Sequence, residues 1–329
     1  MKEKRGIAII GAGRVGRAVA HYLKKFSVGK ADFPDKEKEI KNYGLLIGAL
    51  PGETGERCLE LALKYKKDLI DVSDVDPPAY LKKKKEITQS RITVIPGCGF
   101  CPGLVNFITA RELDGVDNAK SIEIKAGSLS RKRFFYPFLW CFEDIVLGHR
   151  LSSHQVISGK EKIFPPFSGY KRESFFGIDA ESYYCASGFE NMFKKYKVRD
   201  FTYRVIRPHG FMNFFMYLEN QGFFEKQDLV WTKKILESQK MDNLTLAEIR
   251  IIARGKHITW KMQSSSRRQE SLNSMQKITA SVPAAVARLL IEGKIKDSGL
   301  LFMEELGRQR QLFTQLLQEI NREVRVIRQ

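Results

Sequence analysis

The sequence lacks the features that mark membrane-embedded and secreted proteins. No apolar run approaches the roughly 20 residues that a bilayer-spanning helix needs, and the first six residues contain no apolar signal-peptide core. Cysteine is scarce: there are five, an odd number without the spacing of a disulfide framework. We therefore expect a cytoplasmic protein with reduced thiols.

Acidic residues are too few to balance the basic ones. The chain has 56 lysines and arginines against 38 acidic residues, a formal charge of +18. Such an excess can attract nucleic acid, an anionic membrane surface or anionic small molecules. The basic residues lie in short scattered clusters, however, and no nucleic-acid recognition motif accompanies them. We interpret them as solvated faces and expect neither nucleic acid nor membrane as a partner.

Glycines near the start of the chain form the pattern of a dinucleotide-binding turn. An apolar strand, Gly6–Ile10, leads into Gly11-Ala-Gly-Arg-Val-Gly16, and a segment with helical spacing follows. In that fold the glycines allow a tight turn, a close approach of backbone to pyrophosphate and tight helix packing. The strand before the motif and the helix after it make chance occurrence improbable. We expect a cofactor site at Gly11, Gly13, Arg14, Val15 and Gly16.

A second strand, Ser27–Asp32, would end in the acidic residue that binds the adenosine ribose. Asp32 stands 21 positions after Gly11, close to the usual interval. Asp favours NAD because a 2′-phosphate would meet its negative charge, whereas the nearby Lys30 and Lys36 leave NADP as an alternative. A surface acid is the other interpretation of Asp32.

The segment after Asp32 is too short for a complete dinucleotide domain. Only Phe33–Tyr43 separates it from the next strand, Gly44–Leu50, whereas a βαβ unit needs about 30 residues. We therefore predict a Rossmann-type parallel sheet that lacks one outer strand. Strands and helices then alternate as far as Ile95, as a parallel sheet requires. Loops at the carboxyl ends of its strands should complete the cofactor site with Ala49, Leu50, Pro51, Val72 and Ser73.

The pattern changes after residue 118 to that of an α+β domain with a largely antiparallel sheet. Alternating segments predict strands and hairpins, and helical spacing predicts helices. The strands and hairpins are expected at 121–125, 154–163, 199–206 and 246–262, and the helices at 180–196 and 275–292. The tail, 306–329, has the pattern of a basic amphipathic helix.

Several of these segments together resemble one enzyme family. Gly11–Gly16, Leu45–Gly52, Asp68–Asp74, Pro96–Asn106 and Thr279–Gly293 occur in the order seen in the saccharopine dehydrogenase-like family, most closely its lysine 6-dehydrogenase branch. The resemblance is strong over the first 110 residues and looser in the middle of the chain.

The resemblance implies a domain organisation and an activity. A Rossmann domain, 1–118, would be rejoined by 275–305, and 119–274 would form a substrate and dimerisation domain. The implied reaction is NAD(P)-dependent oxidation or reduction at the CH–NH or CH–NH2 group of an amino acid, through an imine. Lysine or a saccharopine-like conjugate would be the substrate, and a homodimer or larger homo-oligomer the assembly.

The turn Cys98-Gly-Phe-Cys101 has three interpretations. A dithiol redox pair fits its place between a strand and a helix. Zinc needs about four ligands, and no second Cys-x-x-Cys pair occurs, so we expect no metal. The turn also resembles the family's Gly-x-Gly-Phe-x-Pro-Gly turn, in which the cysteine positions vary. That resemblance places Gly99, Phe100 and Asn106 beside the substrate.

Two arginines and a histidine are candidates for handling an amino-acid substrate. A substrate carboxylate suits an arginine fork, and Arg204 and Arg207, three apart on a strand, should point to opposite faces. The family's motif favours Arg207, although the family has an aromatic residue and proline where this chain has Pro208 and His209. His209 is the candidate proton acceptor, with His149 and His154 as alternatives.

Two other functions stay open at this stage. The shortened cofactor domain and the altered arginine–histidine motif would also suit a nucleotide-binding sensor or scaffold without turnover. A thiol redox protein built on Cys98 and Cys101 is the third hypothesis.

Overall fold

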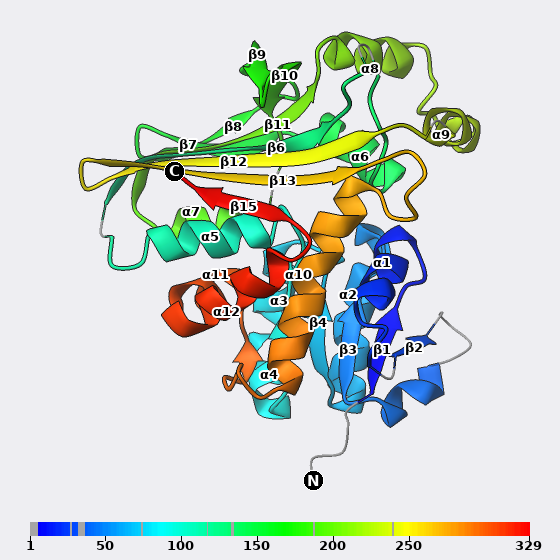
Figure 1. Cartoon of the computed structure of the whole chain (residues 1–329), viewed down its shortest axis with the longest axis vertical. Coiled ribbons are helices and arrows are strands. Elements are labelled where there is room, and N and C mark those ends of the chain that lie inside the picture. Colours follow the sequence, from blue (N-terminus) through cyan, green and yellow to red (C-terminus); the bar gives the residue numbers. More distant parts are fainter. Residues whose placement is uncertain are drawn as a thin grey trace. The chain divides into compact units, whose positions relative to one another are not determined.

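The computed structural model describes residues 6–26, 28–31, 37–73, 75–116, 118–132, 135–186, 188–238 and 240–329. The chain divides into two compact units (Figure 1). Unit 1 comprises Met1–Gly115 and Gln276–Val324, and unit 2 comprises Val116–Met275 and Arg325–Gln329. None of the described helices is long and apolar enough to cross a membrane.

Unit 1 contains a six-stranded parallel sheet in the order β14-β5-β4-β3-β1-β2. Its central strands are apolar and buried on both faces, as a parallel sheet covered by helices requires. The strands are β1 (Ile7–Ile10), β2 (Val28–Ala31), β3 (Leu45–Gly48), β4 (Asp68–Asp71), β5 (Thr93–Ile95) and β14 (Gly299–Leu300). The helices are α1 (Arg14–Tyr22), α2 (Gly52–Tyr65), α3 (Pro77–Lys82), α4 (Lys84–Ser90), α5 (Leu104–Glu112), α10 (Ser274–Ile291), α11 (Met303–Arg308) and α12 (Arg310–Ile320).

The predicted loss of an outer strand is confirmed. Among the described residues β2 pairs only with β1 and forms one edge of the sheet, and the sixth strand, β14, joins the opposite edge from the C-terminal return. A short 3-10 helix, η1 (Glu37–Asn42), stands where the missing unit would begin. Its Ile40 is buried in the core, and Glu37 accepts hydrogen bonds from Arg57, Lys64 and Tyr65 of α2.

Unit 2 contains a nine-stranded mixed sheet that is antiparallel apart from the β6–β11 pair. The main path runs β15-β13-β12-β6-β11-β10-β9, and β7 and β8 form a hairpin beside β11. Its strands are β6 (Ala119–Leu129), β7 (Ser153–Ile157), β8 (Lys160–Phe164), β9 (Lys171–Phe175), β10 (Ile178–Tyr184), β11 (Val198–Pro208), β12 (Asn243–Ala253), β13 (Lys256–Ser266) and β15 (Arg325–Arg328). Its helices are α6 (Phe142–Arg150), α7 (Glu190–Lys195), α8 (Phe211–Asn220) and α9 (Leu229–Glu237). The predicted α/β class, a parallel sheet plus a largely antiparallel one, is confirmed.

Two predicted helices differ from the structure. The segment 180–196 contains the end of β10 and then α7, because pairing with β9 and β11 stabilises an extended backbone through Tyr184. The tail, 306–329, is not one helix: it contains the end of α11, then α12, and finally β15, which pairs with β13 through Val326 and Ile327. β-branched residues suit that strand.

Candidate functional site

The three glycines of the first turn each have a separate structural task. Gly11 has a φ of +108°, and a Cβ there would overlap the carbonyl of Ala49 on the next loop. A Cβ at Gly16 would overlap the carbonyl oxygen of Gly11, so only glycine lets α1 pack so close to β1. A Cβ at Gly13 would meet nothing within 4 Å. The backbone at Gly13 is therefore open to a ligand, which fits the pyrophosphate of a dinucleotide.

Loops at the carboxyl ends of β1, β3 and β4 meet at this turn. The Leu50 amide donates to Ser73 Oγ at 3.0 Å, and the Val72 amide donates to the Gly48 carbonyl at 2.9 Å. Ala49 and Pro51 belong to the same loop as Leu50, and Arg14 and Val15 begin α1. The structure thus brings together all the sequence-predicted cofactor residues of unit 1 except Asp32, which lies outside the described residues.

Asp71, which the sequence analysis did not single out, ties these loops together. Its carboxylate is completely buried and accepts hydrogen bonds from the Ser73 amide and the Tyr80 hydroxyl, both at 2.8 Å. Its carbonyl accepts from the Cys98 amide at 2.8 Å. Burial raises the pKa of the Asp71 carboxyl above its ordinary value. The only sequence signal is its position as the last residue of an apolar strand.

The turn after β5 is held by contacts between backbone atoms. Gly103 has a φ of +129° and lies against Gly99, whose carbonyl accepts from the Leu104 amide at 2.9 Å. Gly99 also lies beside Val72: a Cβ built there would be 3.2 Å from Val72 Cγ2. This contact brings the turn, with the buried Phe100, to the loops that would hold the cofactor.

The cysteines of this turn do not form a reactive pair. None of the five cysteines forms a disulfide, Cys98 is completely buried, and burial raises the pKa of its thiol. A thiol kept protonated is a poor nucleophile. Among the described residues no group of three or more His, Cys, Asp or Glu side chains could hold a metal ion.

Both polar atoms of the Asn106 side chain are hydrogen-bonded within unit 1. Its Oδ1 accepts from the Gly103 amide at 3.0 Å and its Nδ2 donates to Glu304 Oε1 at 2.9 Å. The side chain is 4 % exposed. Substrate binding by Asn106 stays a prediction, because both ends of its amide already have partners.

Arg204 and Arg207 have contrasting surroundings on β11. Arg204 Nε donates to Ser182 Oγ at 3.0 Å, and its Nη2 donates to the carbonyls of Ser182 and Gly169. It also lies over the Tyr184 ring. These contacts occupy the Arg204 guanidinium, so a ligand would have to compete with them.

The Arg207 guanidinium is buried against two aromatic rings. It lies 5.0 Å from the Tyr136 ring and 5.5 Å from the Phe211 ring, and Nη1 donates to the Ile206 carbonyl. Its Nε has no hydrogen-bond partner, and no Asp or Glu among the described residues pairs with it. An unpaired buried charge is costly, so Arg207 has both a charge and a donor available for an anionic ligand.

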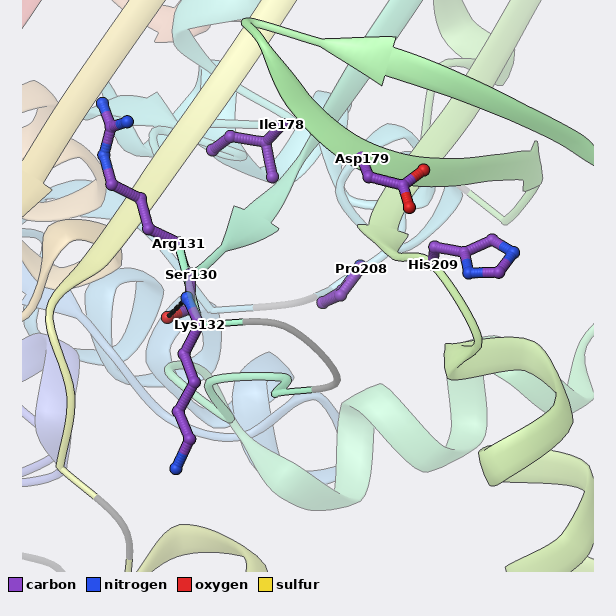
Figure 2. A pocket seen from close by; sticks show the side chains of 7 residues that line it. All are labelled: Ser130, Arg131, Lys132, Ile178, Asp179, Pro208 and His209. Atoms are coloured by element: carbon purple, nitrogen blue, oxygen red, sulfur yellow. Dashed lines mark hydrogen bonds between the residues drawn. The ribbon is translucent and has the colours of Figure 1, made fainter.

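The three candidate histidines differ in accessibility and partners. His209 lines a pocket (Figure 2) whose other residues are Ser130, Arg131, Lys132, Ile178, Asp179 and Pro208. Its turn is held by Glu181, which accepts from the Gly210 amide at 2.7 Å. His149 is buried between Tyr183 and the Ile145 carbonyl, and burial lowers its pKa to about 3. His154 of β7 is bonded to Glu161 of the exposed strand β8.

Figure 2 shows the arrangement of this pocket. The Asp179 carboxylate and the His209 imidazole lie on one side of it, and Arg131 and Lys132 extend in opposite directions on the other. Asp179 is itself bonded to Arg172 at 2.9 and 3.0 Å. The two cations beside His209 were missed by the sequence analysis, because their short basic cluster was interpreted as a solvated face.

Comparison with known proteins gives a clear result for the fold. The chain matches no protein-family model and no curated protein. Among solved structures it is similar to the apo form of saccharopine dehydrogenase (L-Glu forming) from Saccharomyces cerevisiae, with a TM-score of 0.74, 14% identity, and coverage of 99% of this chain and 100% of that one. The chain has the saccharopine dehydrogenase fold.

Two further solved structures give TM-scores below 0.5. An engineered D-amino acid dehydrogenase bound to NADP+ gives a TM-score of 0.47 at 14% identity, covering 92% of this chain and 94% of that one. DAP dehydrogenase from C. glutamicum in complex with DAP gives 0.45 at 12% identity, with coverage of 92% and 93%. The saccharopine dehydrogenase match has a much higher TM-score and covers both units of this chain.

Proposed function

We propose that the protein is an NAD(P)-dependent oxidoreductase that acts at the CH–NH or CH–NH2 group of an amino acid. This proposal rests on Arg207, a buried guanidinium that pairs with no Asp or Glu of the described residues, in a fold shared with a saccharopine dehydrogenase. The Tyr136 and Phe211 rings lie against the guanidinium, and its Nε–H is unused. A substrate carboxylate bound in the guanidinium plane would supply both the missing charge and the missing acceptor.

The cofactor belongs at the carboxyl end of the parallel sheet. The open backbone at Gly13 would receive the pyrophosphate, at the start of α1 where helix amides favour anions. The loops at Leu50 and Ser73, tied to each other by a hydrogen bond, would border the nicotinamide. Nicotinamide supplies hydride acceptance or donation when bound. We favour NAD on the basis of Asp32 in the sequence.

The chemistry that this chain would support is amine oxidation or its reverse. In the oxidative direction a bound oxidised cofactor would take the hydride from the carbon that bears nitrogen, and a C=N bond would form as the nitrogen loses a proton. Water then adds to the imine. His209, which lines a pocket in unit 2 and is free of the buried contacts that hold His149, would accept the proton.

A matched pair of arginine variants tests this function. The full-length protein is assayed by NADH or NADPH absorbance with lysine, saccharopine and related amino acids, in both directions. We expect turnover, and Arg207→Lys should raise KM for the amino acid by about 10- to 100-fold, because a lysine cannot reproduce a bidentate pair. Arg322→Lys, at the exposed Arg322 that follows α12, is the control and should retain KM.

The two halves of the proposal can fail separately. A protein that binds NADH but turns over none of these substrates would instead be a nucleotide-binding sensor or scaffold. A protein that binds neither NADH nor NADPH would overturn the cofactor assignment as well. Cys98→Ala with Cys101→Ala should retain turnover, and its complete loss would restore the thiol hypothesis.

A further inference from the structure

The sheet face that carries Arg207 also carries a buried tyrosine–histidine pair. The register pairs Tyr183 of β10 with Val205 of β11, and Arg207 stands two residues further along β11. Tyr183 is therefore a diagonal neighbour of Arg207 on the same face of the sheet. The Tyr183 hydroxyl lies 2.9 Å from His149 Nε2, and both side chains are buried. The charge of Arg207 acts on both of them, so the pair belongs to the surroundings of the guanidinium.

The hydrogen bonds of His149 fix its tautomer. Its Nδ1 lies 2.6 Å from the Ile145 carbonyl oxygen, which can only accept a hydrogen bond, so Nδ1 carries the proton. Burial lowers the pKa of His149 to about 3, so the ring is neutral near pH 7 and Nε2 holds a lone pair. The Tyr183 hydroxyl must then donate its hydrogen to Nε2. Towards a ligand, the Tyr183 oxygen can act only as an acceptor.

The carboxylate that the register places opposite Arg207 is bonded elsewhere. Glu181 is the cross-strand partner of Arg207. Its carboxylate accepts hydrogen bonds from the amides of Gly210 and Met212, at the start of α8. Arg207 Nε, in contrast, has no partner among the described residues. This face therefore combines a cationic donor at Arg207 with an oxygen at Tyr183 that can only accept.

We propose that the Tyr183 oxygen binds the ammonium group of an amino acid whose carboxylate binds Arg207, and that His149 is a positioning residue that makes this oxygen an acceptor. The inference rests on the proposed function, which places the carboxylate at Arg207. An amino-acid zwitterion has its carboxylate and its ammonium group on one carbon, so one molecule can bond to both side chains. A neutral His149 ring does not repel the ammonium group, whereas an imidazolium would.

Two probes that differ in a single group test this assignment. Norleucine has a carboxylate and an ammonium group, whereas hexanoate is the same chain without the ammonium group. Isothermal titration calorimetry of the full chain with NAD+ present measures the Kd of each. We expect Tyr183→Phe to raise the Kd of norleucine by about 10- to 100-fold and to leave that of hexanoate unchanged, because one hydrogen bond to a charged group is lost. Arg207→Lys should weaken the binding of both probes.

Variants of His149 separate positioning from a purely structural role. His149→Phe removes the acceptor, so the Tyr183 hydroxyl can turn its hydrogen towards the ligand. The Kd of norleucine should then rise about tenfold relative to that of hexanoate. His149→Gln can present an amide oxygen in place of Nε2 and should keep the natural ratio, whereas a structural role alone would change stability and not this ratio. Tyr217→Phe is the control for the tyrosine change, since Tyr217 is 64 % exposed on α8, and should retain both constants.

The outcomes distinguish this inference from the proposed function. A natural protein that binds hexanoate as tightly as norleucine contradicts the ammonium site, as does a Tyr183→Phe variant that weakens both probes equally or neither. If neither probe binds the natural protein, the carboxylate site at Arg207 is wrong as well. Norleucine binding that depends on Tyr183 in a protein without turnover would overturn the proposed activity and retain the ammonium site. Circular dichroism of each variant confirms that it is folded.

Discussion

Asp71 links the acidity of the medium to the stability of the cofactor loops. Burial raises the pKa of its carboxyl above the ordinary 3.8, so the folded protein holds this proton more tightly than the unfolded chain does. The contribution of Asp71 to stability is therefore greatest below pH 3.8, and it is lost as pH rises through the pKa of the folded state. An asparagine at this position does not ionise, so Asp71→Asn removes this loss of stability. Its side-chain oxygen can still accept a hydrogen bond from the Ser73 amide. We expect the free energy of unfolding of the variant, relative to the natural protein, to increase with pH.

Urea denaturation at a series of pH values measures this difference directly. A difference that stays constant with pH would mean that Asp71 has the same protons in the folded and unfolded states. Asp71→Ala provides the comparison for the hydrogen bonds, since it removes the acceptor for both Ser73 and Tyr80 and should weaken cofactor binding that Asp71→Asn retains.

Single residues show where prediction from sequence ends. Arg204 and Arg207 look equivalent in the sequence, yet Arg204 donates to Ser182 and to two carbonyls, whereas no carboxylate in the described part of the chain pairs with Arg207. That difference depends on β10 and on the segment carrying Tyr136, which no local pattern connects with β11. The role of Asp71 could not be predicted from the sequence for the same reason. Its partner Tyr80 lies beside it only because the β4–α3 loop folds back.

At the scale of one element, the glycine turn gives opposite predictions for two neighbouring glycines. Gly13→Ala adds a methyl group where nothing lies within 4 Å, in a backbone with φ −65° that alanine adopts. We expect the fold to be unaffected and NADH binding to weaken by about tenfold or more, because the methyl occupies the approach of the pyrophosphate. Gly16→Ala should instead destabilise the protein by about 1–3 kcal/mol, since its methyl overlaps the Gly11 carbonyl.

Thermal unfolding and an NADH fluorescence titration of both variants separate the two effects. If Gly13→Ala binds NADH as tightly as the natural protein, the pyrophosphate does not lie at this turn. If Gly16→Ala is as stable as the natural protein, α1 can move away from β1 without cost.

Elements were predictable where a local pattern and the tertiary structure agree. Local patterns predicted strands β1 to β5, the β7–β8 and β12–β13 hairpins and helix α10. Predictions were wrong where a distant partner decides: β10 is extended because strands lie on both sides of it, and β15 exists because β13 offers an edge. The missing outer strand was predictable because a spacer of 11 residues, Phe33–Tyr43, cannot contain a βαβ unit whatever its contacts.

At the scale of the whole molecule, the charge of +18 and the exposed apolar side chains of α8 and α9 act in opposite directions on self-association. Long-range repulsion between two such chains opposes association, whereas burial of apolar side chains favours it. Salt screens the repulsion, with a Debye length of about 10 Å at 0.1 M and about 3 Å at 1 M, and leaves an apolar contact in place. We expect a homo-oligomer whose dissociation constant decreases as sodium chloride is raised across this range.

The sign of this salt dependence distinguishes the physical origins of self-association. Contacts made by complementary charges, or by a nucleic acid bridging two basic chains, weaken with salt. Sedimentation of the natural protein at low and high salt, after nuclease treatment, gives the sign. Trp231→Glu, measured in parallel, shows whether the exposed apolar side chains of α9 take part in the contact. A homo-oligomer that dissociates as salt rises would mean that charged surfaces hold the copies together.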